Sequence, residues 1–563
     1  MTTGSGRTST LNWVLVALLC LVLFAAFLGR DPFFDRDEGE YATVARSMIE
    51  RSDYVIPHVN DRPYYEKPAL YFWLTALSFK LFGYNEAAGR LPSVLAGLAL
   101  VGLMGWFGRR HGGDRLGLFG AVFAATTFLI ALLARVALMD ALLTLFTTAT
   151  LVFYYEGLGR TNGRNWFWAA WISMGLAFLT KGPVGAVVPL GVVFFFHVLR
   201  GDIFGAIKKA RFPSGILLFL IVAGPWYAMA FLREGEKFWQ GFFISQNVGR
   251  FVDVVLGHGA PLWFYIPVLL VMAWPWGLFG MAGFWNGLVK NWRNRKADGL
   301  MGLDYFLAVW LLISFVIFSL AATKQPNYVL PSVPPLILLA GRWWQDYLAR
   351  EDAPFPWVLL GITALLGLIL AAVFVAAGLL IPEAISQARV GVKPDSFEYA
   401  FGPGLPNLGW FTPAWGILVG LSAMAALWFG RSRQTRRVLA LLIAGAAIFC
   451  FGFIHLTGPR VLDYLQAPAK VVGLAAAQTV GPKDDLAAFG LYKPTLWFYT
   501  GHHIQRIRTN ETDTLKQYLD RKDRVYLLSR VSLLPAIQAA GPFEVIQQEG
   551  GYVFGANRPG AVQ

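Results

Sequence analysis

Apolar residues along this chain gather in segments of about 20 residues, the length that an α-helix needs to cross a lipid bilayer. We expect about thirteen such segments, at residues 11–29, 90–108, 116–134, 138–156, 166–181, 184–199, 214–232, 262–286, 302–321, 327–345, 356–381, 413–430 and 438–456. The pattern predicts an α-helical polytopic membrane protein with about thirteen transmembrane helices.

The pattern changes after residue 456. Short apolar runs such as LAAFGLY, RVYLLS and GYVFGA alternate there with turn and charge clusters, which is typical of a small α/β domain. We therefore divide the chain into a transmembrane domain, residues 1–456, and a soluble C-terminal domain, residues 457–563. The first also contains a long polar loop, residues 30–89.

This loop combines acids with an amphipathic pattern. Its apolar positions recur at three- and four-residue spacing, at Tyr41, Val44, Ala45, Met48 and Ile49. They predict a short helix that lies flat on the membrane surface. Four acids come just before or at its start, Asp31, Asp35, Asp37 and Glu38, and the later stretch YYEKPALYFW adds Lys67 and aromatic rings. An acid run alone most often forms a solvated loop, but the added lysine and rings favour a binding site.

Composition agrees with a membrane protein, because 56% of the residues are hydrophobic and 15% are charged. The net charge of +14 is explained by basic cytoplasmic loops rather than by nucleic-acid binding. With the N-terminus in the cytoplasm, six connections fall on the cytoplasmic side, of which 109–115, 157–165, 200–213, 289–299 and 431–437 are plainly basic and 346–354 is not. The first apolar segment then acts as a retained signal anchor. The loop 30–89 and the C-terminal domain lie on the other face, and Cys20 and Cys450 offer no disulfide framework.

Costly polar residues gather on that non-cytoplasmic side, which favours a shared cavity over separate surface positions. They are Asp35, Asp37, Glu38, Glu66, Lys67, Arg135, Asp140, Lys181, Arg250, His258, Lys324 and Tyr328. Lys181 and Lys324 each precede a helix-breaking proline, and together with Lys67 and Arg250 they form a cationic set suited to a phosphate. Snorkelling to the membrane surface is the competing account for Lys181. A structural Arg135–Asp140 ion pair is the alternative for Asp140.

No nucleotide loop GxxxxGK[ST] and no dinucleotide fingerprint occurs in the sequence. We expect no ATP or NAD requirement and no other cofactor. A divalent metal near Asp37, Glu38 or Glu66 is left open, because these acids lack a firm ligand spacing.

Several motifs resemble, in order and spacing, the bacterial aminoarabinose lipid A transferases, which belong to the C-type glycosyltransferases together with protein O-mannosyltransferases. They are DRDEGEYATVARSMIE, YYEKP, MDALL, FLTKGP, GPWY, FWQGFF, HGAPLWFY and ATKQPNYVLP, spread over about residues 11–345. The resemblance implies an inner-membrane enzyme whose periplasm-facing cavity takes a sugar from undecaprenyl phosphate. Residue by residue, it implies catalytic acids at Asp37 and Asp140, and carrier or cavity contacts at Tyr64, Lys67, Arg250 and Tyr328.

One position departs from that family. Relatives that modify lipid A read DETRYAE, whereas this chain reads DEGEYAT and carries Glu40 in place of an arginine proposed to touch the donor phosphate. An anion there reverses the sign of the interaction, so the sugar and the acceptor stay open. We expect Glu40 to point to solvent or into an ion pair.

These observations predict a glycosyltransferase that moves aminoarabinose or a related sugar from undecaprenyl phosphate to lipid A or another periplasmic acceptor. A mannosyltransferase-like enzyme with a different acceptor and a lipid-linked-sugar transporter are the alternatives, and a monomer is the default expectation. We expect catalysis by Asp37, Glu38 and Asp140, and substrate binding by Tyr64, Lys67, Arg250, Lys324 and Tyr328, with support from Glu66, Lys181 and His258. Asp35, outside the Asp–Glu pair, is expected to matter less than Asp37.

Overall fold

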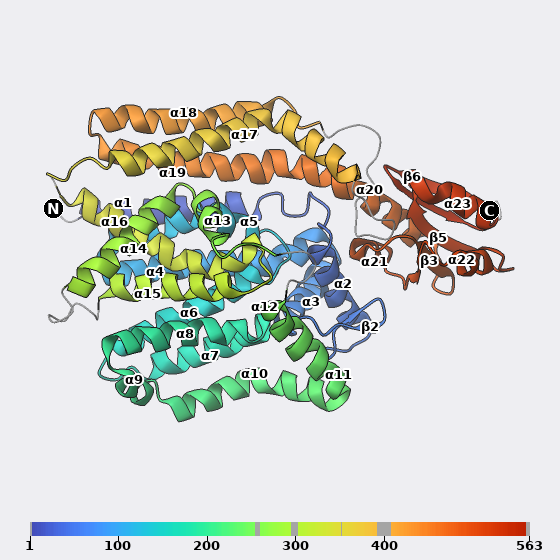
Figure 1. Ribbon diagram of the computed structural model, residues 1–563, viewed down its shortest axis with the longest axis horizontal. Helices are drawn as coiled ribbons and strands as arrows, with labels where there is room; N and C mark the ends of the chain where they lie inside the picture. The colour runs from blue at the N-terminus through green and yellow to red at the C-terminus, as the bar shows by residue number, and fades with distance from the viewer. Residues whose placement is uncertain (1–2, 254–258, 294–301, 351, 391–406, 559–563) are drawn as a thin grey trace.

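The computed structural model describes residues 3–253, 259–293, 302–350, 352–390 and 407–558. Most of these residues form helices that run side by side in one bundle, and a five-stranded sheet lies at one end of it (Figure 1). The N-terminus lies near the opposite end of the long axis. The molecule is therefore a membrane-type helix bundle with a terminal domain.

Each predicted apolar segment is helical in the structure. The bundle helices are α1 (Thr3–Cys20) with its π-helical extension η1 (Leu21–Ala25), α4 (Glu86–Ala125), α5 (Phe128–Leu133), α6 (Asp140–Leu158), α7 (Arg164–Lys181), α8 (Val184–Arg200), α10 (Phe212–Glu234), α13 (Tyr265–Met272), α14 (Trp276–Arg293), α15 (Leu303–Leu320), α16 (Val333–Leu348), α17 (Trp357–Val390), α18 (Phe411–Arg431) and α19 (Thr435–Phe451). The short connectors are α9 (Ile203–Lys209), α11 (Glu236–Phe238), η2 (Trp239–Gly249), α12 (Arg250–Val252) and η4 (Pro326–Ser332).

Fewer of these helices qualify as membrane spans than the sequence predicts. Among the described residues, 7 helices are long and apolar enough to cross a bilayer, or up to 8 if the bent pair α13 and α14 is one span. One reason is that α4 joins two predicted segments in 40 residues, with a break at Gly113 where φ is 75°. Other segments are divided between shorter helices. The fold is polytopic, and the full count of about thirteen stays a prediction.

The long loop folds into α2 (Asp37–Glu50), a hairpin of β1 (His58–Val59) and β2 (Arg62–Pro63), and α3 (Leu70–Phe82). The apolar stripe of α2 is buried as predicted, but most of its first three turns are buried as well. The polar side is covered by α21 (Pro494–Thr500), since Thr43 donates to the Pro494 carbonyl and Arg46 to the Phe498 carbonyl. The C-terminal domain thus packs on this helix, and its predicted position on the membrane surface stays a prediction.

The C-terminal domain holds a mixed sheet in the order β4-β3-β5-β7-β6. Its strands are β3 (Asp485–Phe489), β4 (Gln505–Ile507), β5 (Val525–Arg530), β6 (Glu544–Glu549) and β7 (Tyr552–Ala556), with helices α21, α22 (Thr512–Leu519) and α23 (Leu534–Ala540). β3 runs parallel to β4 and β5, whereas β7 is antiparallel to both its neighbours. The predicted α/β domain is thus present.

The sheet domain is joined to the bundle by a long helical segment. Helix continues from Thr435 to Thr479 through α19, η5 (Gly452–Thr457) and α20 (Gly458–Thr479). The expected domain boundary at residue 457 lies inside this segment, and the first strand begins only at Asp485. The helix carries the chain from the bundle into the domain that covers α2 (Figure 1).

Candidate functional site

A polar cavity of about 470 Å³ lies beside α2, the helix on which α21 of the C-terminal domain packs. It is lined by residues from α2 and the segment before it, the YYEKP segment, the start of α6, the end of α7, and η4 with the residue before it. They are Phe34, Arg36, Asp37, Glu40, Tyr41, Tyr64, Glu66, Lys67, Leu138, Asp140, Lys181, Gln325, Asn327 and Tyr328. Most of the site residues predicted from the sequence therefore line the same cavity.

Asp37 is the first residue of α2 and faces this cavity. Its carboxylate makes no hydrogen bond or ion pair with any residue that the structure describes. Burial by the surrounding protein raises the pKa of Asp37 above its ordinary value, while Lys67 and Arg36 act in the opposite direction. An uncommitted carboxylate with a raised pKa is suited to accept a proton or to orient a hydroxyl.

Arg36 and two glutamates form an ion-pair group on one side of Asp37. The Arg36 guanidinium lies 3.5 Å from Glu40 and 3.7 Å from Glu66, and Arg36 Nε is buried without a hydrogen-bond partner among the described residues. Burial raises the pKa of Glu40 to about 7, although Arg36 opposes that shift. Glu40 is 3% exposed, so the expected ion pair is confirmed and the expected solvent orientation is wrong.

Asp140 and Lys181 form a second pair across the cavity. Lys181 Nζ lies 2.7 Å from Asp140 Oδ1 and 4.6 Å from the ring centroid of Tyr328. Lys181, expected only to support the site, therefore lines it directly. The alternative Arg135–Asp140 lock is wrong, because the Arg135 guanidinium donates instead to the carbonyls of Leu23 and Phe24.

Lys67 and Tyr64 also line the cavity. Lys67 Nζ lies 3.2 Å from the Glu66 carbonyl, and its charge acts on Asp37 more strongly than that of any other cation. Tyr64 is buried against Phe72, with ring centroids 5.9 Å apart. The YYEKP motif thus supplies a cation, an acid and a ring to the cavity.

Glu38, predicted to be catalytic, does not line the cavity. Its carboxylate is 2% exposed and accepts two hydrogen bonds from Arg90, one from Nε and one from a terminal nitrogen, each at 2.9 Å. It also accepts hydrogen bonds from the backbone N–H groups of Phe34 and Ala137. With all these donors in place, Glu38 holds the acidic segment against α4, which corrects the prediction of a catalytic role.

Three other predicted binding residues have different outcomes. Lys324 is buried, its Nζ donates to the Ala321 carbonyl at 2.6 Å, and it is not among the lining residues of the cavity, which include its neighbour Gln325. Arg250 begins α12, but its side chain lies outside the described part of the structure. His258 lies outside the described residues altogether.

Arg36 is a charged lining residue that sequence reasoning missed. It stands directly before Asp37 in DRDEGE, so its position in the acidic run was the available signal. A ring from the C-terminal domain, Tyr492, lies 6.0 Å from its guanidinium. The C-terminal domain therefore reaches the edge of the cavity.

Asp35 has a structural role next to the cavity. Its carboxylate and Lys493 Nζ are 3.0 Å apart, and both side chains are 0% exposed. The backbone N–H and hydroxyl of Thr495 also donate to Asp35. This buried junction fixes the chain two residues before Asp37, and the expectation that Asp35 matters less than Asp37 for activity stays a prediction.

A narrower, mostly apolar cavity of about 140 Å³ adjoins the polar one. The two share Glu66, Lys67, Lys181 and Tyr328. Its other lining residues are Leu143, Val184, Gln246, Asn247, Phe251, Ile317, Phe318, Ala321 and Thr323. An anionic group at the shared lysines would thus have an apolar space beside it.

The acids of the cavity do not form a metal centre with the geometry that a cation needs. Among the described residues, no three His, Cys, Asp or Glu side chains come together in a way that could hold a metal ion. The site is organised by pairs of opposite charge.

Comparisons with known proteins point to one family. The model described as dolichyl-phosphate-mannose-protein mannosyltransferase matches residues 66–228. The undecaprenyl phosphate-alpha-4-amino-4-deoxy-L-arabinose arabinosyl transferase of Serratia proteamaculans is 30% identical over 383 residues, 66% of each chain. The enzyme of that name from Edwardsiella ictaluri is 29% identical over 339 residues, and the matched part spans 59% of its length.

The fold is shared over the whole chain with a solved structure. The crystal structure of ArnT from Cupriavidus metallidurans bound to undecaprenyl phosphate has a TM-score of 0.76 at 21% identity, and the match covers 99% of both chains. The likeness includes the bundle and the terminal domain. The structural likeness shows the fold, and the sequence matches show that the chain belongs to the family of the undecaprenyl phosphate-aminoarabinose arabinosyl transferases, within the wider mannosyltransferase-like group of membrane proteins.

Proposed function

We propose that this protein is a membrane glycosyltransferase that moves a sugar from a polyprenyl phosphate to an acceptor at one membrane face. The observation that carries the proposal is Asp37, a carboxylate with a raised pKa and no described partner, in a cavity that also presents Arg36, Lys67 and Lys181. Family membership supports the same activity.

The two adjoining cavities suit a lipid-linked donor. The phosphate would lie at Lys67 and Lys181, which line both spaces, and the isoprenoid chain would follow the apolar lining of Ile317 and Phe318. Arg36 Nε, buried without a described partner, is a third donor for this anion. Cations at these positions stabilise the negative charge that collects on a departing phosphate.

The reaction is a displacement at the anomeric carbon. An acceptor oxygen forms the new bond to that carbon, the bond from the carbon to the phosphate oxygen breaks, and its electron pair stays on the polyprenyl phosphate. If the acceptor is a hydroxyl, Asp37 takes its proton, a contribution of roughly 10²–10⁴-fold for a general base. If the acceptor is a phosphate, it is already anionic and Asp37 orients it.

The finer assignment is aminoarabinose as the sugar and lipid A as an acceptor. Four carboxylates and three cations line the cavity, counted over its described residues as Asp37, Glu40, Glu66 and Asp140 against Arg36, Lys67 and Lys181. An excess of acid suits a sugar that carries an ammonium group. The names of the relatives support the same donor, undecaprenyl phosphate-linked aminoarabinose. We place the cavity on the periplasmic side of the bacterial inner membrane.

Incubation of the purified full-length protein with undecaprenyl phosphate bearing labelled aminoarabinose, and with lipid A, tests this proposal. We expect labelled lipid A and free undecaprenyl phosphate in equal amounts. Release of carrier without labelled lipid A would point to another acceptor, which a protein or a different glycolipid in the same assay would identify.

The same assay separates an enzyme from a transporter. A transporter in sealed vesicles would move the labelled donor across the bilayer and leave the bond between sugar and phosphate intact. Intact donor on the far side, with no loss of that bond, would contradict the proposed function.

A further inference from the structure

A second polar cavity lies at the other end of α6 from Asp140. It measures about 660 Å³ and is lined by Arg110, His111, Tyr155, Glu156, Leu158, Gly159, Arg160 and Phe196. The 19 residues of α6 extend over about 28 Å at 1.5 Å per residue, close to the thickness of the hydrocarbon core of a bilayer. With Asp140 at one headgroup layer, Glu156 in the last turn lies at the opposite one.

Glu156 orients more cationic groups than it can neutralise. Its side chain is 2% exposed and lies 2.7 Å from Arg110 Nε, 2.7 Å from His111 Nε2 and 3.4 Å from a terminal nitrogen of Arg160. The two terminal nitrogens of Arg110 make no hydrogen bond with the described residues, and neither does Arg160 Nε. One buried carboxylate therefore fixes two guanidinium groups and leaves a net positive charge at the cavity.

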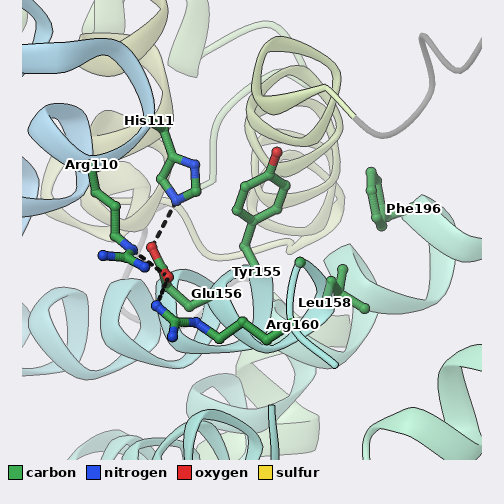
Figure 2. A pocket seen from close by; sticks show the side chains of 8 residues that line it. Arg110, His111, Tyr155, Glu156, Leu158, Arg160 and Phe196 are labelled. Atoms are coloured by element: carbon green, nitrogen blue, oxygen red, sulfur yellow. Dashed lines mark hydrogen bonds and ion pairs between the residues drawn. The ribbon is translucent and has the colours of Figure 1, made fainter. Parts of the chain in front are cut away.

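The opposite wall of the cavity is apolar. Figure 2 shows the charged group around Glu156 on one side and Tyr155, Leu158 and Phe196 on the other. The same turn of α8 exposes Phe195 and Leu199, by 44% and 41%, toward the surroundings of the bundle. A ligand here needs an anionic group next to an apolar body.

Membrane topology alone explains basic residues at this face, but not their fixed geometry. A topological signal requires only charge, whereas here Arg110 and Arg160 are oriented by a buried acid beside a cavity with an apolar wall. The volume also exceeds that of a lone phosphate and is suitable for a lipid headgroup.

We propose that this cavity binds the phosphodiester headgroup of an anionic phospholipid. Arg110 and Arg160 would hold the phosphate, Tyr155 and Leu158 would pack on the glycerol and first acyl carbons, and the chains would follow the outer face of α8. Basic pockets between membrane helices bind anionic headgroups in this manner.

Native mass spectrometry of the purified full-length protein tests the site, with phosphatidylglycerol or phosphatidylcholine as the added lipid. We expect phosphatidylglycerol to be retained in preference to phosphatidylcholine. The double variant Arg110→Gln/Arg160→Gln should lose about tenfold in phosphatidylglycerol retention, since it removes charge-assisted hydrogen bonds. The matched control is Arg109→Gln/Arg115→Gln, which changes two exposed arginines of the same segment that do not line the cavity and should bind as the wild type.

Equal retention by the Arg110/Arg160 variant and the wild type would overturn the proposal, and so would an equal loss in the control pair. Displacement of the lipid by excess inorganic phosphate would assign the site to a free anion and also overturn it. If the glutamine variant does not fold, Arg110→Lys/Arg160→Lys keeps the charge but loses the planar donors. This variant should retain less phosphatidylglycerol than the wild type, and unchanged retention would contradict the assignment.

Discussion

At the scale of a single residue, the charge of the cavity depends on whether the Glu40 carboxyl group is protonated. The carboxylate lies beside Arg36, and burial raises its pKa to about 7. Above that pH it is ionised, occupies Arg36 and repels a phosphate. Below that pH it is neutral, and Arg36 becomes available to an anion.

We therefore expect the KM for the polyprenyl-phosphate donor to fall as the pH is lowered from about 8 to about 6, on either side of the Glu40 pKa. Glu40→Gln should bind the donor about threefold to tenfold more tightly at the higher pH, the effect of one polar interaction, and should show a flat KM over this range. Steady-state kinetics at several pH values measures both. Glu50→Gln, at the exposed end of the same helix, is the control, and a Glu40→Gln profile that still follows pH would show that another group titrates.

Lys67 tests the placement of the donor phosphate. Lys67→Ala should weaken donor use by roughly 1.5–3 kcal/mol, the scale of a hydrogen bond to a charged group, while thermal stability stays close to that of the wild type. Arg250→Ala tests in the same way the contact that the sequence predicts. Lys237→Ala, an exposed lysine outside both cavities, should have no effect. A loss in kcat with an unchanged KM at Lys67 would mean that this lysine acts on the transition state and does not hold the donor.

At the scale of elements, the contact between α2 and α21 links the C-terminal domain to the cavity. The junction is made by the buried Asp35–Lys493 pair and by Thr495. It precedes Asp37 by two residues, so the position of Asp37 depends on a part of the chain more than 450 residues away in sequence.

Asp35→Asn should lower the stability of this junction by about 3–5 kcal/mol, the cost of leaving one member of a buried ion pair without its partner. Limited proteolysis between α20 and β3, together with the thermal unfolding midpoint, measures the effect. Glu50→Gln, which removes an exposed Arg46–Glu50 pair, should change stability by less than about 1 kcal/mol. Wild-type protease resistance in Asp35→Asn would show that the pair does not hold the domain.

The apolar periodicity of α2 was sufficient to predict the helix and its buried stripe, because both are local properties of the sequence. The cover over its polar side was not predictable, since α21 comes from a distant segment. For the same reason Glu38 and Asp37 could not be told apart from sequence. They are neighbours in the chain, but only the fold turns one toward Arg90 and the other into the cavity.

At the scale of the whole molecule, different elements lie at the two ends of the bundle. The loop of α2 and α3 and the C-terminal domain lie at one end, and α9 lies at the other (Figure 1). Reporter fusions after residues 112, 205, 295 and 434 should report cytoplasm, and fusions after 60, 245, 395 and 500 should report periplasm. A cytoplasmic signal at residue 500 would place the C-terminal domain and the cavity beside it in the cytoplasm and would contradict the predicted topology.

Hydropathy predicted the helical segments well because each must satisfy its backbone hydrogen bonds within itself in a membrane. It did not predict that two segments form the single element α4. The polar stretch between them looks like a loop in the sequence, but in the structure it is helical apart from the break at Gly113. The cavity was predicted in outline from Asp37, Lys67, Asp140 and Tyr328. Arg36 and the direct role of Lys181 required the three-dimensional pairing of charges.

The central claim is that Asp37 acts on the transferred sugar or its acceptor, and one rate measures it most directly. Transfer of labelled sugar from undecaprenyl phosphate should fall at least about 10²-fold in Asp37→Asn, as expected for an essential acid or base. The variant should fold as the wild type, since Asp37 has no described partner to lose. The control Asp513→Asn, an exposed acid on α22, should transfer normally. Retention of more than about a tenth of the wild-type rate by folded Asp37→Asn, against that expected loss, would contradict the account.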